Sequence, residues 1–220
     1  MDERIEIRIH GDATLSTLIY LPGLHGDWTL ITGLRNDLAG HVRFVELMYP
    51  RTNTWSLEDY ADAISAKLME HDLTRGWLLG ESFGSQIVWQ LLAKTNSNSG
   101  QTGTWQVEFF RPTGVILAGG FVRYPFPTAL KFMQIWFERL PTWAIRSSFC
   151  AYAVCVRLPQ CIKPEIFESV REFVSRRTQK DVAAMAHRLK LMRSNDPSPA
   201  ASKTSIPARL AQADCVQHGD

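Results

Sequence analysis

The sequence lacks the patterns that mark several common classes of protein. The sequence has four cysteines, Cys150, Cys155, Cys161 and Cys215. Their spacing is neither that of a zinc site nor that of a redox motif. We therefore expect buried free thiols in a reducing compartment. The apolar stretch at residues 147–156 falls far short of the roughly 20 residues that span a bilayer, so we expect a buried or cap helix there and no membrane span.

An excess of charge is also missing. The formal net charge of +2 argues neither for nucleic acid nor for an acidic partner. The basic residues are scattered apart from pairs such as Arg176-Arg177, which we interpret as part of a solvated helix face. Residues 1–4 are charged and do not form the apolar core of a signal peptide, which favours a cytoplasmic protein.

What is present is an alternation of apolar runs and helical patterns over residues 1–120. The chain has 220 residues, 45% of them apolar, enough for a sizeable core. Alternating isoleucines at residues 5–9 predict an edge strand, and a capping-box pattern from Ser56 to Asp59 predicts the start of a helix. Further strands are expected at residues 15–21, 44–48, 76–80 and 113–118. This order predicts an α/β fold with a mostly parallel, doubly wound sheet.

The rhythm changes after Gly120. Residues 121–195 contain helical patterns, one starting at Pro164 and one through Val182, Ala186 and Leu189, so we expect a helical cap over the carboxyl ends of the strands. Residues 196–220 are interpreted as a connector followed by an incomplete or altered strand that begins at residues 206–207.

One motif carries chemistry. Gly80-Glu81-Ser82-Phe83-Gly84 follows an apolar run and precedes a helical pattern, which is the G-x-S-x-G signature in a strand–turn–helix context. Such a turn holds a serine in a strained conformation and exposes its hydroxyl beside a helix N-terminus. A serine that merely caps the helix is the alternative, but the flanking glycines favour a nucleophile at Ser82.

Together these motifs resemble the α/β-hydrolase superfamily, in particular its esterase, thioesterase or acyltransferase-like members. The loop Leu21-Pro22-Gly23-Leu24-His25-Gly26-Asp27 stands where the family has its first oxyanion loop. The segment Leu117-Ala118-Gly119-Gly120 stands at the strand end before the cap. The resemblance covers residues 5–207.

The resemblance implies acyl transfer to Ser82 from a small-molecule ester or thioester. The main-chain N–H groups of Phe83 and Leu24 would hold the oxyanion. In an alternative frame, which uses His25-Gly26, the second donor is Asp27. The implied chemistry needs no metal, nucleotide or prosthetic group, and the absence of a G-x-G-x-x-G loop disfavours a dinucleotide site.

The acid and the base of a catalytic triad are not evident. Asp214 and His218 are weak candidates, because Asp214 is not at the expected spacing and His218 follows only four residues later. We therefore expect a chain that is truncated or altered after Pro207, lacks the last strands and is inactive or impaired. A non-catalytic α/β-hydrolase-like binding protein and a defective gene product are the alternatives.

Other residues near the expected site are assigned weaker roles. His25 is placed to contact substrate, and Glu81 is expected to orient the turn or face solvent. Arg123 is expected in a surface or cap ion pair. Structural or surface roles are expected for the other histidines, His10, His41, His71 and His187. Plain packing is favoured over an acyl pocket for five cap aromatics, Phe121, Phe126, Phe132, Trp136 and Phe137.

Overall fold

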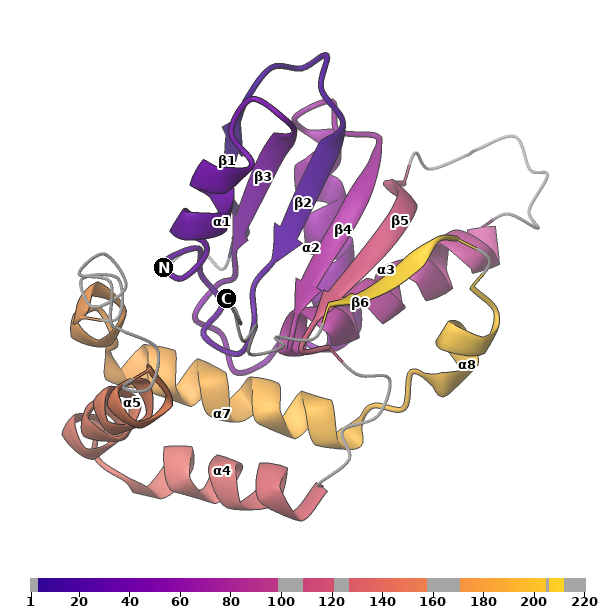
Figure 1. The fold of residues 1–220 in the computed structure, drawn as a ribbon. Coiled ribbons are helices and arrows are strands. Elements are labelled where there is room, and N and C mark those ends of the chain that lie inside the picture. The colour runs from indigo at the N-terminus through magenta and orange to yellow at the C-terminus, as the bar shows by residue number, and fades with distance from the viewer. Residues whose placement is uncertain (1–3, 99–108, 121–126, 158–170, 205, 212–220) are drawn as a thin grey trace, which may run out of the picture.

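The computed structural model describes residues 4–98, 109–120, 127–157, 171–204 and 206–211, and its centre is a six-stranded sheet (Figure 1). The strands are β1 (Glu6–His10), β2 (Thr17–Leu21), β3 (Arg43–Met48), β4 (Arg75–Glu81), β5 (Arg111–Ala118) and β6 (Ala208–Ala211). Their order is β1-β3-β2-β4-β5-β6; β1 is antiparallel to β3, and the other neighbours are parallel. The predicted α/β class and the mostly parallel sheet are confirmed.

Helices pack on both faces of this sheet. The described helices are α1 (Thr32–Asp37), α2 (Leu57–Met69), α3 (Phe83–Asn98), α4 (Pro127–Arg139), α5 (Thr142–Arg157), α7 (Gln179–Ser194) and α8 (Ser198–Ser202). The larger hydrophobic cluster joins the sheet to α2, α3 and the cap helices. The smaller cluster joins the opposite face to residues in and around α1, and there Trp77 and Ile116 stay partly exposed.

The predicted capping box at the start of α2 is present. The Asp59 N–H donates to Ser56 Oγ at 3.1 Å, and the Ser56 N–H donates to Asp59 Oδ2 at 2.7 Å. Thr178 and Asp181 form the same arrangement at the start of α7. These boxes satisfy amide groups that have no acceptor within the helix, and so they fix where α2 and α7 begin.

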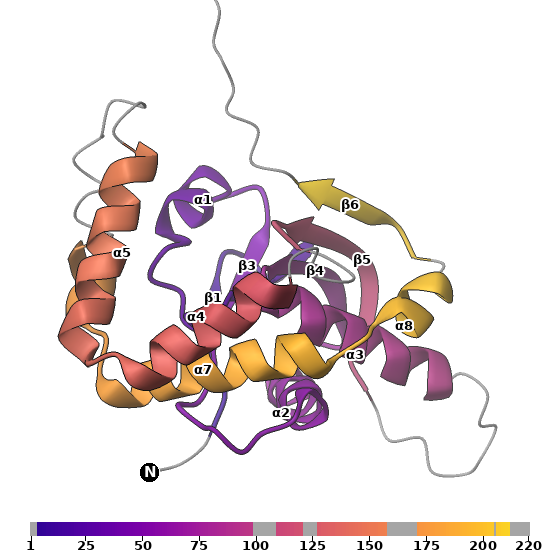
Figure 2. The same cartoon turned by 90° about the horizontal axis from the view of Figure 1, so that it is seen from below.

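Three long helices lie beyond the carboxyl ends of the parallel strands. Figure 1 shows α7 next to the sheet, with α4 on the side of α7 that faces away from it, and Figure 2 shows the same layers from below. The apolar stretch at residues 147–156 lies within α5. None of the described helices has the length and hydrophobicity needed to cross a bilayer.

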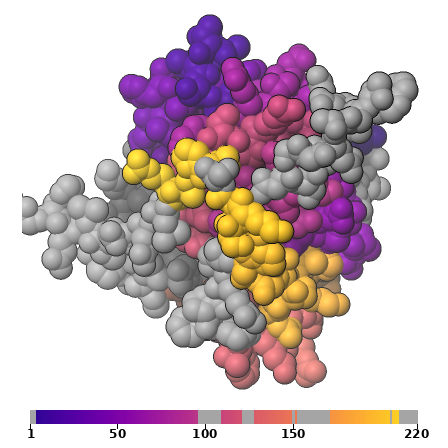
Figure 3. Space-filling model, turned by 90° about the vertical axis from the view of Figure 1, so that its right-hand side faces the viewer, coloured from indigo at the N-terminus to yellow at the C-terminus, as the bar shows by residue number. Residues whose placement is uncertain are grey.

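The ends of two segments have more helix than a loop would have. The helix α3 runs to Asn98, and the predicted connector after residue 195 contains the short helix α8. After it, residues 208–211 pair in parallel with β5 although Arg209 interrupts the apolar run. Figure 3 shows β6 and α8 as a yellow band on the molecular surface, where β6 is the last described strand of the sheet. The second helical pattern, from Pro164, starts outside the described residues.

A glycine-to-alanine pair tests how tightly the strand–helix junction is packed. A Cβ at Gly84 would lie 2.2 Å from the Leu21 carbonyl oxygen, whereas a Cβ at Gly33 in α1 meets nothing within 4 Å. We expect Gly84→Ala to lower the free energy of unfolding by about 1–3 kcal/mol or more because the backbone must move.

Gly33→Ala is the matched control. It should leave stability unchanged or raise it by up to about 1 kcal/mol, since alanine favours the helix. Urea denaturation monitored by circular dichroism measures both variants, and equal stabilities would contradict the close approach.

Candidate active site

Ser82 occupies the turn between β4 and α3 in a conformation that non-glycine residues rarely adopt. Its φ is +48°, in the left-handed region, and its side chain is partly exposed. The Ser82 N–H donates to the Ala118 carbonyl at 3.1 Å, and the Ser82 carbonyl accepts from the Ser85 N–H at 3.0 Å and from Ser85 Oγ at 2.6 Å. Such a backbone costs about 1–3 kcal/mol and persists only where the surroundings enforce it.

The loop after β2 lies against this turn. A Cβ at Gly23 would be 3.4 Å from the Glu81 side chain and carbonyl oxygen. The Gly26 N–H donates to the Gly23 carbonyl at 3.0 Å, which closes a turn over residues 23–26. Because a trans peptide points its C=O and N–H in opposite directions, the Leu24 N–H faces out of that turn. Phe83 is the first residue of α3, so its N–H has no acceptor within the helix.

Arg188 of α7 holds the same loop from the cap side. It is buried and donates to the Leu24 carbonyl at 2.9 Å, the Pro50 carbonyl at 3.0 Å and the Tyr60 hydroxyl at 3.4 Å. A Cβ at Gly26 would lie only 2.4 Å from Arg188 Nη1, and the φ of Gly26 is +77°. Glycine at position 26 thus makes room for the guanidinium group.

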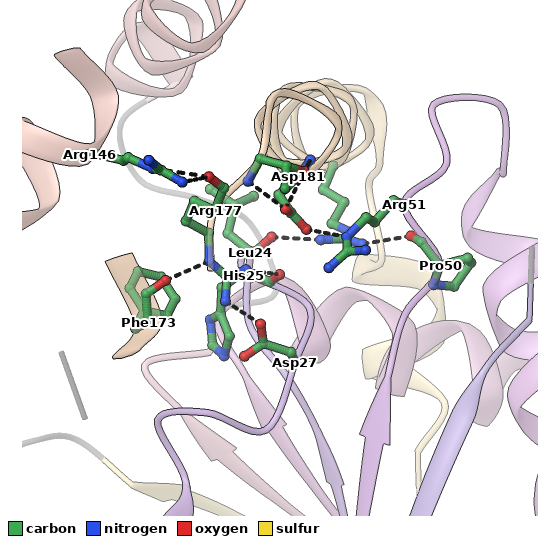
Figure 4. Close-up of polar contacts among 11 residues, drawn as sticks. Leu24, His25, Asp27, Pro50, Arg51, Arg146, Phe173, Arg177 and Asp181 are labelled. Carbon is green, nitrogen blue, oxygen red and sulfur yellow. Dashed lines mark hydrogen bonds and ion pairs between the residues drawn. The ribbon is translucent and has the colours of Figure 1, made fainter. Parts of the chain in front are cut away.

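Arg177 makes a second buried contact with the loop (Figure 4). Its guanidinium donates to the His25 carbonyl at 3.3 Å and to the Phe173 carbonyl at 3.0 Å, and pairs with the Asp27 carboxylate. Burial raises the pKa of Asp27, but the neighbouring His25 and Arg177 outweigh it and leave the pKa below its ordinary value. Arg146 of α5 in turn donates to the Arg177 carbonyl at 3.0 Å.

The interpretation of Arg176-Arg177 as a solvated helix face is therefore wrong for one of the two. Arg176 is exposed and pairs with Glu172 one turn earlier, whereas Arg177 lies just after that turn and is 2% exposed. The guanidinium group of Arg177 contacts the carbonyl and the ring of Phe173 in the interior, and it pairs with the carboxylate of Asp27. The helix ends at residue 175, and the two arginines that follow it have opposite surroundings.

His25 is buried in the middle of the loop. Its ring contacts Phe173 edge to face at 5.7 Å, and its buried Nε2 has no hydrogen-bond partner among the residues that the structure describes. Burial lowers the pKa of His25; nearby Glu81 and Asp27 oppose this, and Arg177 acts with it. The imidazole is therefore neutral at physiological pH, and the ring packs in the interior.

Glu81 precedes the turn serine and is partly buried. The hydroxyl of Tyr20 donates to its carboxylate. Burial raises the pKa of Tyr20 well above its ordinary value, and the charge of Glu81 adds to the effect, so the phenol keeps its proton. This hydrogen bond and the contact with Gly23 fit the expectation that Glu81 orients the turn.

The remaining predicted residues divide into three groups. His187 Nε2 donates to the Trp55 carbonyl at 2.8 Å, and His10 pairs with Glu46 at 3.3 Å, which are structural contacts. His41 and His71 are exposed. Outside the described residues lie Asp214, His218, Phe121, Arg123 and Phe126. The thiols of all four cysteines are likewise among the side chains not described.

The described cap aromatics differ from one another. Phe137 is buried, as packing requires, but Phe132 is 74% exposed and Trp136 is 53% exposed, so these two do not pack in the core. Two hollows are found on the described surface, one of about 440 Å³ between α3 and α8 and one of about 670 Å³ between α4, α5 and α7. Neither is lined by Ser82.

Sequence reasoning missed the two buried arginines and Gly26. A signal for Arg188 did exist, because it falls on the buried stripe of α7 together with Met185, Leu189 and Met192. A charged residue at such a position is either paired or held by several acceptors. Arg177 had no comparable signal, since its burial depends on a contact with a loop about 150 residues earlier in the chain.

The adjacent arginines provide a matched test of the contacts between cap and loop. Arg177→Ala removes the partner of a buried carboxylate, and we expect the free energy of unfolding to fall by about 3–5 kcal/mol. Arg176→Ala removes an exposed pair and should change stability by less than about 0.5 kcal/mol. Urea denaturation distinguishes them; similar losses in both variants would contradict the burial of Arg177.

A pH series tests the environment of His25. The unfolded chain protonates this residue below about pH 6.5, and the folded chain resists protonation because burial lowers its pKa. The unfolded state then binds more protons, so stability must fall as the pH decreases through that value. We expect His25→Gln to reduce this pH dependence, and His71→Gln, at an exposed site, to preserve it. Denaturation midpoints on either side of pH 6.5 measure the effect; an unchanged slope in His25→Gln would refute it.

Comparison with known proteins adds structural neighbours. No family model and no curated protein matches the sequence. Among solved structures, a hydrolase from Pseudomonas aeruginosa superposes with a TM-score of 0.72 at 12% identity, covering 94% of this chain and 74% of that one. An enol-lactonase from Burkholderia xenovorans gives 0.69 at 14% identity (94% and 76% covered), and an esterase from Exiguobacterium antarcticum gives 0.68 at 13% identity (94% and 75% covered). With its sheet order, helical layers and these neighbours, the chain has the α/β-hydrolase fold.

Proposed function

We propose that the protein is a serine hydrolase in which Ser82 accepts the acyl group of an ester or thioester. The observation that carries this proposal is the positive φ of Ser82 at the turn between β4 and α3. A strained non-glycine residue at the carboxyl end of a central strand is typical of a nucleophile, and a helix-capping serine has no need of this conformation.

The surroundings of Ser82 support acyl transfer. The hydroxyl oxygen would attack the carbonyl carbon, and the oxygen of that carbonyl would become negative. The N–H of Phe83, at the start of α3, and the N–H of Leu24, which faces out of the turn at 23–26, are the donors proposed for this oxyanion. The contact between Gly23 and Glu81 favours Leu24 over Asp27 as the second donor, since it brings the start of the loop against the serine turn.

The proton of the Ser82 hydroxyl needs a base. His218, supported by Asp214, remains the candidate that the order of residues along the chain suggests, and both lie outside the described residues. His25 is a poor alternative, because its ring is buried and burial lowers its pKa. A triad completed by His218 would release the alcohol or thiol first, and water would then cleave the acyl-serine.

The neighbours support the same class of chemistry. The three reported above are a hydrolase, an enol-lactonase and an esterase, and each is named for hydrolysis. A small ester, lactone or thioester is therefore the proposed substrate class.

Labelling with a fluorophosphonate probe tests the proposal. The wild-type protein should be modified at one site, and Ser82→Ala should reduce labelling to background. Ser147→Ala, at an exposed position of α5, is the control and should label like the wild type. Circular dichroism confirms that each variant is folded. Folded wild-type protein that resists the probe would overturn the proposal and favour a non-catalytic binding protein.

A further inference from the structure

The largest exposed apolar side chains gather on one part of the cap. Seven large hydrophobic residues are strongly exposed in the part of the chain that the structure describes, and five belong to α4 or the first turn of α5. These five are Phe132, Met133, Ile135, Trp136 and Trp143. Clustered exposure of this kind marks an interaction surface, whereas single exposed residues need no explanation.

Helix geometry places three of them, Phe132, Ile135 and Trp136, on the side of α4 opposite the core. Leu130 and Phe137 of α4 are buried, and α4 packs closely against α7. Phe132, Ile135 and Trp136 stand at positions i, i+3 and i+4 and share the other side of the helix. Figure 2 shows α4 on the cap face turned toward the viewer. A helix that is apolar on both sides has a partner on each side, and the sheet-facing partner is α7.

The charge of the cap identifies the partner. Residues 121–195 contain 13 basic and 5 acidic residues, so they carry a formal charge of +8. The rest of the chain has 11 basic and 17 acidic residues, a formal charge of −6. Arg177 and Arg188 are buried, and without them the cap keeps 11 basic and 5 acidic residues, a formal charge of +6. The near-neutral total thus hides a basic cap on an acidic core.

Basic side chains surround the exposed aromatic residues. Lys131 and Arg139 are exposed on α4 itself, and Arg139 lies on the same helical side as Phe132. From α7, Arg193 donates to Gln134, and Lys190 lines the hollow that Trp143 also lines. The acidic residue on α4, Glu138, accepts from Gln134 at 2.8 Å.

We propose that this surface, formed by the outer side of α4 and by Trp143, docks onto an anionic lipid membrane. Tryptophan prefers the interface between headgroups and acyl chains, and flanking lysine and arginine residues bind acidic headgroups. A second copy of the chain fits less well, because two basic caps would repel each other. This inference is independent of the proposed chemistry at Ser82.

Vesicle binding tests the inference. The wild-type protein should co-sediment with vesicles of phosphatidylglycerol and phosphatidylcholine, and much less with phosphatidylcholine alone. Raising the salt concentration should weaken binding. Lys131→Gln with Arg139→Gln should lower the affinity about fivefold per charge removed.

Serine substitutions separate the apolar contribution. Phe132→Ser with Trp136→Ser and Trp143→Ser should reduce binding at least about tenfold, since each side chain loses its transfer from water. Leu30→Ser with Leu34→Ser, which removes the other two exposed apolar residues, is the matched control and should bind like the wild type. Quenching of wild-type tryptophan fluorescence by brominated lipids gives a readout that needs no variant.

Several results would overturn the inference. They are no binding to anionic vesicles, equal binding to neutral vesicles, no quenching by brominated lipid, and a concentration-dependent dimer that the triple serine variant abolishes. Binding to RNA that displaces the vesicles would instead assign the basic cap to nucleic acid.

Discussion

The structure depends on two guanidinium groups that reach from the cap into the loop after β2. Arg188 donates to the Leu24 carbonyl and Arg177 donates to the His25 carbonyl. The carbonyl groups of the two central residues of the turn at 23–26 are therefore held by the cap. Neutral acceptors dominate the contacts of Arg188, and Asp27 pairs with Arg177. Buried charges of this kind contribute little net stability, but removal of either partner is costly, which makes the loop conformation specific.

This arrangement links the two features on which acyl transfer would rely. The Ser82 turn is held by hydrogen bonds to Ala118 of β5 and Ser85 of α3, whereas the opposing loop is held by the cap. The close approach of Gly84 to Leu21 joins them. Small movements of the cap would therefore change the position of one proposed oxyanion donor and leave the serine in place.

The sequence alone predicted the features that depend on local chemistry. The alternation of strands and helices, the Ser56–Asp59 capping box and the turn at Ser82 all follow from residue patterns within a few positions. The burial of Arg177 and the exposure of Trp136 did not follow, because both depend on which helix packs against which. Arg209 shows the same limit: β5 provides a ladder of partners, and this pairing outweighs an unfavourable local composition.

The distance along the chain between the cap arginines and their loop has a consequence for folding. The contact from Arg177 to His25 spans 152 positions, and the contact from Arg188 to Leu24 spans 164. During synthesis the serine turn can form once β5 has emerged, but the facing loop has to wait for α7. Such long-range closure is slow, so the loop is expected to be the last part of the site to reach its native geometry and the first exposed to misfolding.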